Sequence, residues 1–598
     1  MSIWRESINL TKCSKSSTAM TVRTYQRFGI PLYGESSCCH SYNKLIQSKF
    51  GSISKQSAQN AQAITRADAK TDVKSPSTPN VWSGSLSQTF VRQHVSTYTK
   101  KITEPFKKSQ FTAFHSDKKS GILYKQPNGY PTLMDGCGNA SFATQATGSN
   151  KDWDDSCMEL LCSKINDLLQ VKLPQVTELR TKYGHTKIGD ITICQVLGGM
   201  RDMVGMNCET SHLDPNTGIT YRGLTIPQIL EQLPGATAGS MCPYAESALW
   251  LLLTGQVPTH EEANMLSKEL ARRARIPPYV FKVLDQLPID THPMTQYIVA
   301  ISALQTGSVF RKAYNEKKYR RDNAWNLALE DALTLIAQNP LIVGYIYRRT
   351  FVDNTITDGR GMVYDADLDY GANLAKLIGN DTPEFRDMMR LYITVHADHE
   401  GGNVSAHSAL LIGSALTDPY FCFAGALAGL SGPLHGLANQ ECLSWLNNLV
   451  AELKGQEINV ENVTKFAQDT LKNGQVIPGY GHAVLRVEDP RHTAFVQFAH
   501  SKFPDDPLVK VLDVCLQAIP PVLQATGKVK SPHPNVDCST GVLLSRFGIT
   551  QPDMYTVFFG ISRAIGIMSQ LVWSRALRMP IERPKSHTVD QLMEMCKE

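Results

Sequence analysis

The chain has 598 residues, too many for one ordinary domain, and its hydrophobic fraction of 42% is enough to build a sizeable core. Its net charge of +5 hides an asymmetry, because residues 1–150 hold 19 Lys+Arg against 7 Asp+Glu, whereas the other 448 residues hold 41 against 48. No run of eighteen apolar residues is free of charge, so we predict no membrane span. The 14 cysteines are scattered without a Cys-x-x-Cys pair, which indicates reduced thiols and excludes a disulfide framework or a zinc ribbon.

Residues 1–50 are rich in serine, and seven basic residues in this range face only Glu6 and Glu35. This composition is typical of a mitochondrial transit peptide. The alternative is a basic tail that carries no address, or one that holds acidic partners by charge alone. Residues 51–154 are polar and show little apolar periodicity, so we predict a disordered, low-complexity extension there.

From about residue 155 the sequence indicates one helix after another. Apolar residues recur every three or four positions in residues 442–453, namely Cys442, Leu446, Leu449 and Leu453. Similar periodicity is present in residues 245–253, 329–336 and 557–571. Strand signals are few, and hairpin dipeptides are nearly absent. The predicted fold class is therefore all-α.

Residues 431–441, SGPLHGLANQE, place a histidine where a helix begins. Gly432 and Gly436 add no side chain, and Pro433 suits the first turn of a helix. The positive end of the helix dipole disfavours a charged imidazole, so we expect His435 to stay neutral and to donate a hydrogen bond near pH 7. A capped helix with a purely structural histidine is the alternative for this stretch taken alone.

Two further stretches each place one ionisable side chain next to a turn. In residues 476–491, VIPGYGHAVLRVEDPR, His482 follows a Pro-Gly-Tyr-Gly turn. In residues 534–544, PNVDCSTGVLL, Asp537 lies between a Pro-Asn turn and an apolar run. Partial burial would raise the pKa of this carboxyl group and make it a better base.

Taken together, the three stretches resemble the active-site segments of the citrate synthase family, eukaryotic mitochondrial type. The likeness begins near residue 157 and covers about three quarters of the chain, through GGMRDM, LTGQVPT, THPMTQ and HADHEGGNVSAH to ISRAIGIMSQLVWSRAL and IERPKS. It implies a large helical domain of residues 155–436 and 549–598, a small helical domain of residues 437–548, and a cleft between them. It also implies a homodimer in the mitochondrial matrix, with active sites completed across the interface and no nucleic-acid partner.

The resemblance implies that acetyl-CoA condenses with oxaloacetate and water to give citrate and CoA, the entry step of the tricarboxylic acid cycle. Acetyl-CoA is then a substrate, and no cofactor or metal is expected. Asp537 would remove the methyl proton, while His435 would donate to the thioester oxygen. His482 would polarise the ketone of oxaloacetate and protonate the alkoxide that forms from it.

The family pattern also assigns binding positions. Those for oxaloacetate are His399, Asn403, Arg491, Arg563 and Arg583, the last reaching across the dimer interface. Those for CoA are Arg201, Arg486, Lys530, Val476, Pro478, Gly479, Tyr480 and Gly481. Either Arg320 or Arg321 would reach the CoA of the partner subunit, and the sequence does not distinguish between them.

Three other interpretations compete with this one. A metal-dependent hydrolase would use the cluster His396, Asp398, His399, Glu400 and His407, although its spacing is not the His-Glu-x-x-His of zinc proteases. A 2-methylcitrate synthase would use propionyl-CoA, and a non-catalytic descendant would serve as a scaffold.

The chain also departs from the family close to Asp537. It has Cys538-Ser539-Thr540 where relatives commonly have Ala-His-Ser, and His533 replaces a tryptophan. We expect these changes to alter the packing behind the base and its pKa, but not its identity.

Overall fold

The structure is a computed structural model that describes residues 156–237 and 240–597. The predicted transit peptide, residues 1–50, and the predicted extension, residues 51–154, lie outside the described residues. Both stay predictions.

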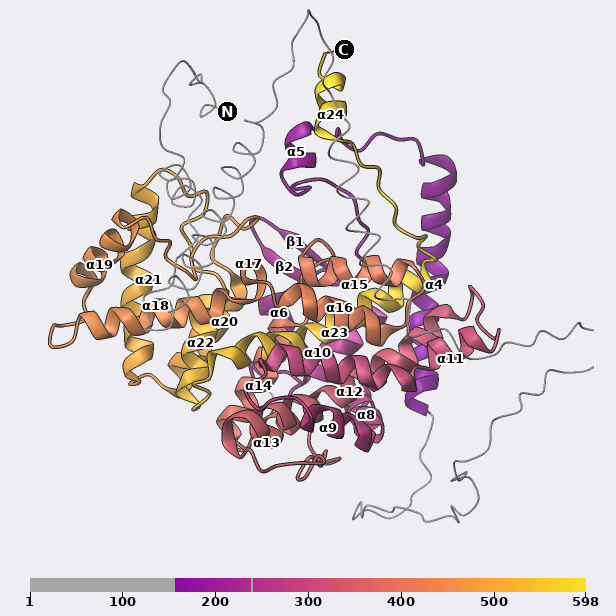
Figure 1. Cartoon of the computed structure of the whole chain (residues 1–598), viewed down its shortest axis with the longest axis horizontal. Helices are drawn as coiled ribbons and strands as arrows, with labels where there is room; N and C mark the ends of the chain where they lie inside the picture. The colour runs from indigo at the N-terminus through magenta and orange to yellow at the C-terminus, as the bar shows by residue number, and fades with distance from the viewer. Residues whose placement is uncertain (1–155, 238–239, 598) are drawn as a thin grey trace, which may run out of the picture. The chain divides into compact units, whose positions relative to one another are not determined.

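Helices make up most of the described chain, which confirms the all-α prediction (Figure 1). The first group is α4 (Ser156–Lys182), α5 (Ile193–Leu197), α6 (Ile226–Gln232), α7 (Ala245–Thr254), α8 (His260–Arg273), α9 (Pro278–Asp285) and α10 (Pro293–Leu304). The second is α11 (Val309–Asn315), α12 (Ala324–Tyr347), α13 (Tyr370–Ile378), α14 (Pro383–His396), α15 (Val404–Ser414), α16 (Pro419–Leu430) and α17 (Pro433–Gly436). The third is α18 (Ala438–Glu452), α19 (Val460–Lys472), α20 (Pro490–Lys502), α21 (Pro507–Ala525), α22 (Asp537–Arg546), α23 (Tyr555–Ala576) and α24 (Val589–Met595).

One small antiparallel sheet interrupts the helices, in the order β1 (Ser211–Asp214), β2 (Gly218–Tyr221) and β3 (Leu224–Thr225). The Asp214 carboxylate closes the turn between β1 and β2 by accepting the N–H groups of Asn216 and Thr217 at 2.8 and 2.9 Å. This hairpin could not be predicted from the sequence, because its strands are at most four residues long and its turn lacks the usual two-residue signal.

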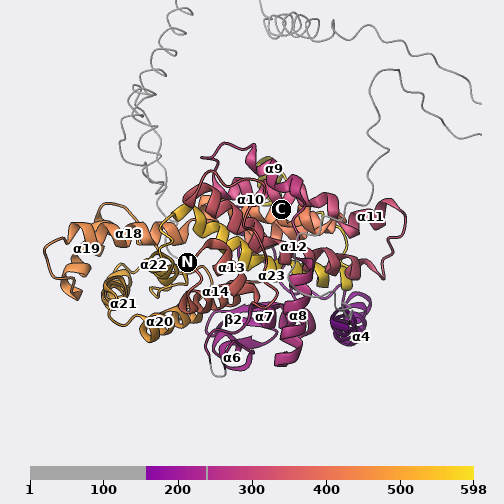
Figure 2. The same ribbon diagram turned by 90° about the horizontal axis from the view of Figure 1, so that it is seen from below.

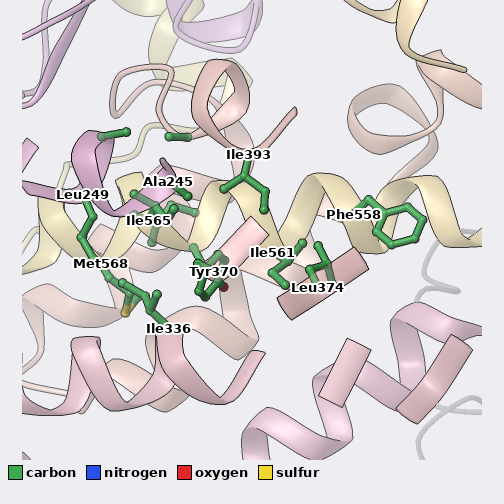
Figure 3. Close-up of a cluster of buried hydrophobic side chains, with 14 of the residues drawn as sticks. Ala245, Leu249, Ile336, Tyr370, Leu374, Ile393, Phe558, Ile561, Ile565 and Met568 are labelled. Carbon is green, nitrogen blue, oxygen red and sulfur yellow. The ribbon is translucent and has the colours of Figure 1, made fainter. Parts of the chain in front are cut away.

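The larger hydrophobic core surrounds α23, whose apolar side chains pack against those of α7, α12, α13 and α14 (Figure 3). Two helices of the described chain, α21 and α23, are long and apolar enough to cross a membrane by length and composition alone. In α23, however, 94% of the apolar window is buried inside the protein. Burial of this kind is what a core helix requires, and the absence of a membrane span stays a prediction.

Gly566 allows α23 to approach the segment that follows α14. Its N–H donates to the carbonyl of Ala397 at 3.0 Å, and a Cβ at this position would lie 2.6 Å from the Cβ of Asp398. This close approach brings Arg563, one helical turn earlier, to the loop of residues 397–403.

A second, smaller core is built from α18, α19, α21 and α22, which lie with α20 at one side of the larger cluster in both views (Figures 1 and 2). The periodic residues Cys442, Leu446, Leu449 and Leu453 are all buried in it, as predicted for an amphipathic helix. All members of this core fall between residues 442 and 542. The predicted division into a large and a small domain is compatible with two cores and stays a prediction.

Candidate active site

Hydrogen bonds join the loop of residues 476–482 to the turn that begins α22. The N–H of Gly481 donates to the carbonyl of His533 at 2.9 Å, and the Asn535 N–H donates to the carbonyl of Gly479 at 2.9 Å. Gly479 has a φ of +81°, and a Cβ there would lie 2.6 Å from the sulfur of Cys442, so only glycine fits. The two loops therefore hold the residues that follow them, His482 and Asp537, in one region.

The ring of His482 has one nitrogen fixed by the backbone. Its Nδ1 accepts the N–H groups of Val484 and Leu485, both at 3.0 Å. Because an amide N–H only donates, we assign the proton of the neutral ring to Nε2. Burial and the nearby charge of Arg491 lower the pKa of His482. His482 therefore presents a neutral N–H donor near pH 7.

His435 is the third residue of the single turn α17. Its Nε2 lies 3.4 Å from the backbone N of Ser405, whose N–H points to it, and 3.0 Å from the Ser405 hydroxyl oxygen. Because a backbone N–H only donates, the contact with the Ser405 N–H assigns the lone pair to Nε2 and the proton to Nδ1. Burial, and after it the charge of Arg563, lower the pKa of His435 to about 4.

The predicted neutral state of His435 agrees with this pKa, but the reason given for it was wrong. The structure has a four-residue turn at this point, followed by the separate helix α18, and no long helix begins at Pro433. A single turn has little macrodipole. Burial and a neighbouring cation are the causes instead.

Asp537 is the first residue of α22, and it is partly buried. Burial raises the pKa of its carboxyl group to about 6, although the charges of Arg491 and Arg563 oppose this rise. Within the described residues, no hydrogen-bond donor contacts the Asp537 carboxylate. A carboxyl group in this state is mostly ionised at pH 7 and is a stronger base than an exposed one, as predicted.

Two buried arginines lie close enough to shift the pKa values of Asp537 and His399. Arg491 is held by Asp489, with Nε to Oδ1 at 3.0 Å and Nη2 to Oδ2 at 2.7 Å. Arg563 has no carboxylate partner within the described chain. Its Nε donates to the carbonyl of His396 at 3.1 Å, and its guanidinium lies over the Phe559 ring at 4.6 Å.

An unpaired buried cation is expensive, and burial lowers the pKa of Arg563 to about 10. Such a group is suited to receiving an anion.

The loop of residues 397–403 supplies a further polar group. The ring of His399 lies 5.8 Å from that of His482 between centroids, and its buried Nε2 has no hydrogen-bond partner among the described residues. Burial and the charge of Arg491 hold the pKa of His399 well below its ordinary value. An orphaned buried nitrogen in a neutral ring is a position where a ligand would complete the hydrogen bonding.

Asn403 lies in the same loop as His399, and its side-chain amide makes hydrogen bonds to other protein groups. Its Nδ2 donates to the carbonyls of His399 and Glu400 at 2.9 and 3.0 Å, and its Oδ1 accepts the N–H of Ala406 at 3.0 Å. The Ser405 hydroxyl lies 2.7 Å from the same Oδ1. Both amide protons are therefore used within the loop, and Asn403 supports the positions of His399 and Ser405.

The profile of the family described as "Citrate synthase, C-terminal domain" matches residues 199–585. The chain belongs to the citrate synthase family. "Citrate synthase, mitochondrial" of Daucus carota is 48% identical over 456 residues, which are 76% of this chain and 93% of the relative. The protein of the same description from Saccharomyces cerevisiae is 44% identical over 461 residues, which are 77% of this chain and 95% of the relative.

Solved structures of the family have the same fold at low sequence identity. The citrate synthase of Pyrobaculum aerophilum aligns with a TM-score of 0.56 at 24% identity, covering 68% of this chain and 95% of that one. The enzyme of Thermoplasma acidophilum, a ternary complex with carboxymethyl coenzyme A and oxaloacetate, aligns with a TM-score of 0.55 at 21% identity, covering 66% and 95%. The predicted family, enzyme class and mitochondrial localisation are thus confirmed.

Half of the eight predicted CoA-binding residues are exposed, namely Arg201, Val476, Arg486 and Lys530. Arg201 and Lys530 make no hydrogen bond or ion pair with other described residues. The Arg486 guanidinium instead donates to carbonyls of the preceding residues, Val484 at 2.6 Å and Leu485 at 2.8 Å. Phosphate binding by Arg486 would require this side chain to leave those carbonyls, and the CoA assignments stay predictions.

The residues expected at a dimer interface are exposed as well. Arg583 lies in a segment that is neither helix nor strand, and its side chain makes no hydrogen bond or ion pair with other described residues. Arg321 donates from Nη2 to the carbonyl of Arg578 at 3.3 Å, whereas the guanidinium of Arg320 has no partner in the described chain. These positions do not decide which of the two arginines would reach a partner subunit.

The histidine-rich stretch of residues 396–407 does not converge on one point. Nδ1 of His396 donates to the carbonyl of Tyr392 at 2.9 Å, and the Asp398 carboxylate accepts the hydroxyl of Thr210 at 2.5 Å. His407 lies 3.4 Å from the carboxylate of Glu582. Among residues 156–237 and 240–597, no group of three or more His, Cys, Asp or Glu is arranged to hold a metal ion.

Two residues of the site were missed from the sequence. Asp489 is the N-cap of α20 and the counter-ion of Arg491, which the Asp-Pro-Arg order would have allowed us to predict. Ser405 contacts His435 from thirty residues away in the chain, and no sequence signal indicates that contact.

Proposed function

We propose that this chain condenses acetyl-CoA with oxaloacetate and water to give citrate and CoA, with Asp537 as the base. The observation that carries the proposal is a carboxyl group with a pKa of about 6 in the same region as two neutral histidines and two buried arginines. Base, hydrogen-bond donors and anion-binding groups are the three things that this chemistry needs.

The first step is removal of a methyl proton from acetyl-CoA. A thioester methyl group is a very weak acid, so a base must act while a donor stabilises the negative charge that develops on the carbonyl oxygen. Asp537 takes the proton, and Nδ1–H of His435 donates to the thioester oxygen. Because His435 stays neutral at pH 7, it stabilises an enolate by hydrogen bonding and is not consumed as an acid.

The second step joins the new carbon nucleophile to the ketone carbon of oxaloacetate. Nε2–H of His482 donates to the ketone oxygen and gives up its proton as that oxygen becomes an alkoxide. Water then hydrolyses the citryl thioester and releases CoA and citrate.

Oxaloacetate carries two carboxylates, which need fixed cations with planar geometry. Arg563 offers a guanidinium without a counter-ion, and Arg491 keeps Nη1 free while Asp489 holds its other side. The unpartnered Nε2 of His399 supplies a further polar contact for the same substrate.

The proposal includes a homodimer that brings Arg583 to the site of a second subunit. Exposed apolar side chains on two segments support a covering partner: Ile188, Ile191, Leu197 and Val204 on one, and Ile581, Val589 and Met593 on the other, each at least 59% exposed. Sedimentation velocity at micromolar concentration tests this part, and a monomer with full activity would contradict it.

Release of CoA from acetyl-CoA, measured with a thiol reagent and dependent on oxaloacetate, tests the function. The variants Asp537→Asn and His482→Ala should remain folded by circular dichroism and lose activity. A folded wild-type protein without oxaloacetate-dependent CoA release would contradict the proposal and would favour the scaffold alternative.

A further inference from the structure

The first turns of α20 and α22 lie next to each other in the candidate active site. α20 begins with Pro490, Arg491 and His492, and α22 begins with Asp537. The two helices are in contact, and they lie side by side in both views (Figures 1 and 2). The arginine expected to hold oxaloacetate and the carboxylate expected to act as base are therefore carried by adjacent helix ends.

Two hydrogen bonds join these two ends, and one of them is accepted by the carboxylate of Asp489. The N–H of Val536 donates to Oδ2 of Asp489 at 3.3 Å, and the N–H of Asp489 donates to the carbonyl of Pro534 at 3.3 Å. Both bonds precede the helices. They leave the angle between the two first turns to be set by side chains.

One side-chain pair bridges the first turns themselves. Nδ1 of His492 lies 3.0 Å from the hydroxyl oxygen of Ser539, and both residues are fully buried. The histidine of the pair comes from α20 and the hydroxyl from α22.

The direction of this bond follows from the burial of its members. Nε2 of His492 is buried and has no partner among the described residues. Since a buried unpaired N–H is costlier than a buried unpaired acceptor, we assign the proton to Nδ1. His492 then donates to Ser539, and the Ser539 hydroxyl donates onward to the carbonyl of Val536 at 3.5 Å. Burial lowers the pKa of His492 to about 4, which keeps the ring neutral and the bond in place at pH 7.

We propose that the His492–Ser539 hydrogen bond fixes the position of Asp537 relative to Arg491, and so the distance between the base and the bound oxaloacetate. His492 and Ser539 are positioning residues that do not touch the substrate. The inference rests on the proposed function, because it concerns the alignment of acetyl-CoA and oxaloacetate. Misplacing a reacting group by about 1 Å typically costs about 10²-fold in rate.

Two pairs of variants separate positioning from packing. Ser539→Ala and His492→Phe each remove the bond, whereas Ser539→Thr keeps the hydroxyl and His492→Asn keeps an N–H at the place of Nδ1. Ser302→Ala in α10 is the matched control, since it removes a hydroxyl that bonds only to the carbonyl of Ile298, four residues back. All are measured as full-length protein, with kcat expressed per folded protein.

Ser539→Ala and His492→Phe should each lower kcat by about tenfold and slow the exchange of the acetyl-CoA methyl protons by a similar factor. The double variant should be no slower than either single variant, because both remove the same bond. Ser539→Thr and His492→Asn should keep kcat within about threefold of the wild type, and Ser302→Ala should leave it unchanged.

An active wild type whose kcat survives in both Ser539→Ala and His492→Phe would overturn this inference alone. The same would follow if the two effects were additive, or if His492→Asn were as slow as His492→Phe. An inactive wild type would overturn the proposed function, and the inference with it, so the two failures are distinguishable.

Discussion

Replacing His435 tests the assignment of its proton. The backbone N–H of Ser405 points to Nε2, which leaves Nδ1–H as the donor. Asparagine places its amide N–H near the position of Nδ1, whereas glutamine places it near Nε2. We therefore expect His435→Asn to retain part of the rate, and His435→Gln to be as slow as His435→Ala. Loss of one donor to a developing oxyanion costs about 3 kcal/mol, which is roughly 10²-fold in kcat.

Steady-state kinetics of the three variants between pH 6 and 9 measure this difference. A neutral histidine with a pKa of about 4 does not titrate in this range, so the wild-type rate should not fall as the pH rises above 6.5. If His435→Asn were no faster than His435→Ala, Nδ1 would not be the donor. A wild-type rate that declined between pH 6 and 7.5 would show instead that His435 acts as a cationic acid.

Three further outcomes follow from the structure and the sequence. Burial raises the pKa of Asp537 to about 6, and the base must be ionised to act. The kcat should therefore fall as the pH drops through 6, to about a tenth of its maximum at pH 5. A kcat that is unchanged down to pH 5 would contradict the assignment of Asp537 as the base. Deletion of residues 1–150 should leave a soluble, active enzyme that stays in the cytosol of the cell, since both cores lie after Ser156; an insoluble product would contradict this. Rates with acetyl-CoA and propionyl-CoA should differ by about 10-fold or more in favour of acetyl-CoA, because one methylene is worth about 1–3 kcal/mol in a fitted pocket, and equal rates would favour a 2-methylcitrate synthase.

The helices could be predicted from the sequence because their signals are local. The periodic residues of 442–453 are buried as expected, and Pro433 does begin a turn. The length of that turn could not be predicted, because α17 ends at Gly436, whose carbonyl accepts the hydroxyl of Thr556 at 2.9 Å from 120 residues away in the chain. The sequence therefore predicted the neutral state of His435 for a reason that the fold does not support.

The state of the site depends on contacts between distant segments. Ser405 and Asp398 lie thirty and 172 residues from the groups they contact, His435 and Gln570. The contact between Asp398 and Gln570 depends on the close approach of α23, which Gly566 permits. In contrast, Asp489 and Arg491 are two residues apart, so this ion pair could have been predicted from the sequence.

The buried charge of Arg563 links stability to function. Its pKa, lowered from 12.5 to about 10, indicates that the folded protein disfavours this cation by on the order of 3 kcal/mol when no anion is bound. Arg563→Met should therefore keep or raise the melting temperature without substrate. Oxaloacetate should raise the melting temperature of the wild type but not of the variant, whose KM for oxaloacetate should increase at least about thirtyfold.

Arg349→Met is the matched control for this prediction. Arg349 is also buried, but it lies 3.6 Å from the carboxylate of Asp285 and donates to the carbonyl of Leu287 at 2.9 Å. Its removal leaves the carboxylate of Asp285 without its cationic partner, so the melting temperature should fall while oxaloacetate still stabilises the protein. If Arg563→Met instead lowered the melting temperature as much as Arg349→Met and kept its response to oxaloacetate, the unpaired cation would be a structural group. The substrate carboxylate would then have to be held elsewhere.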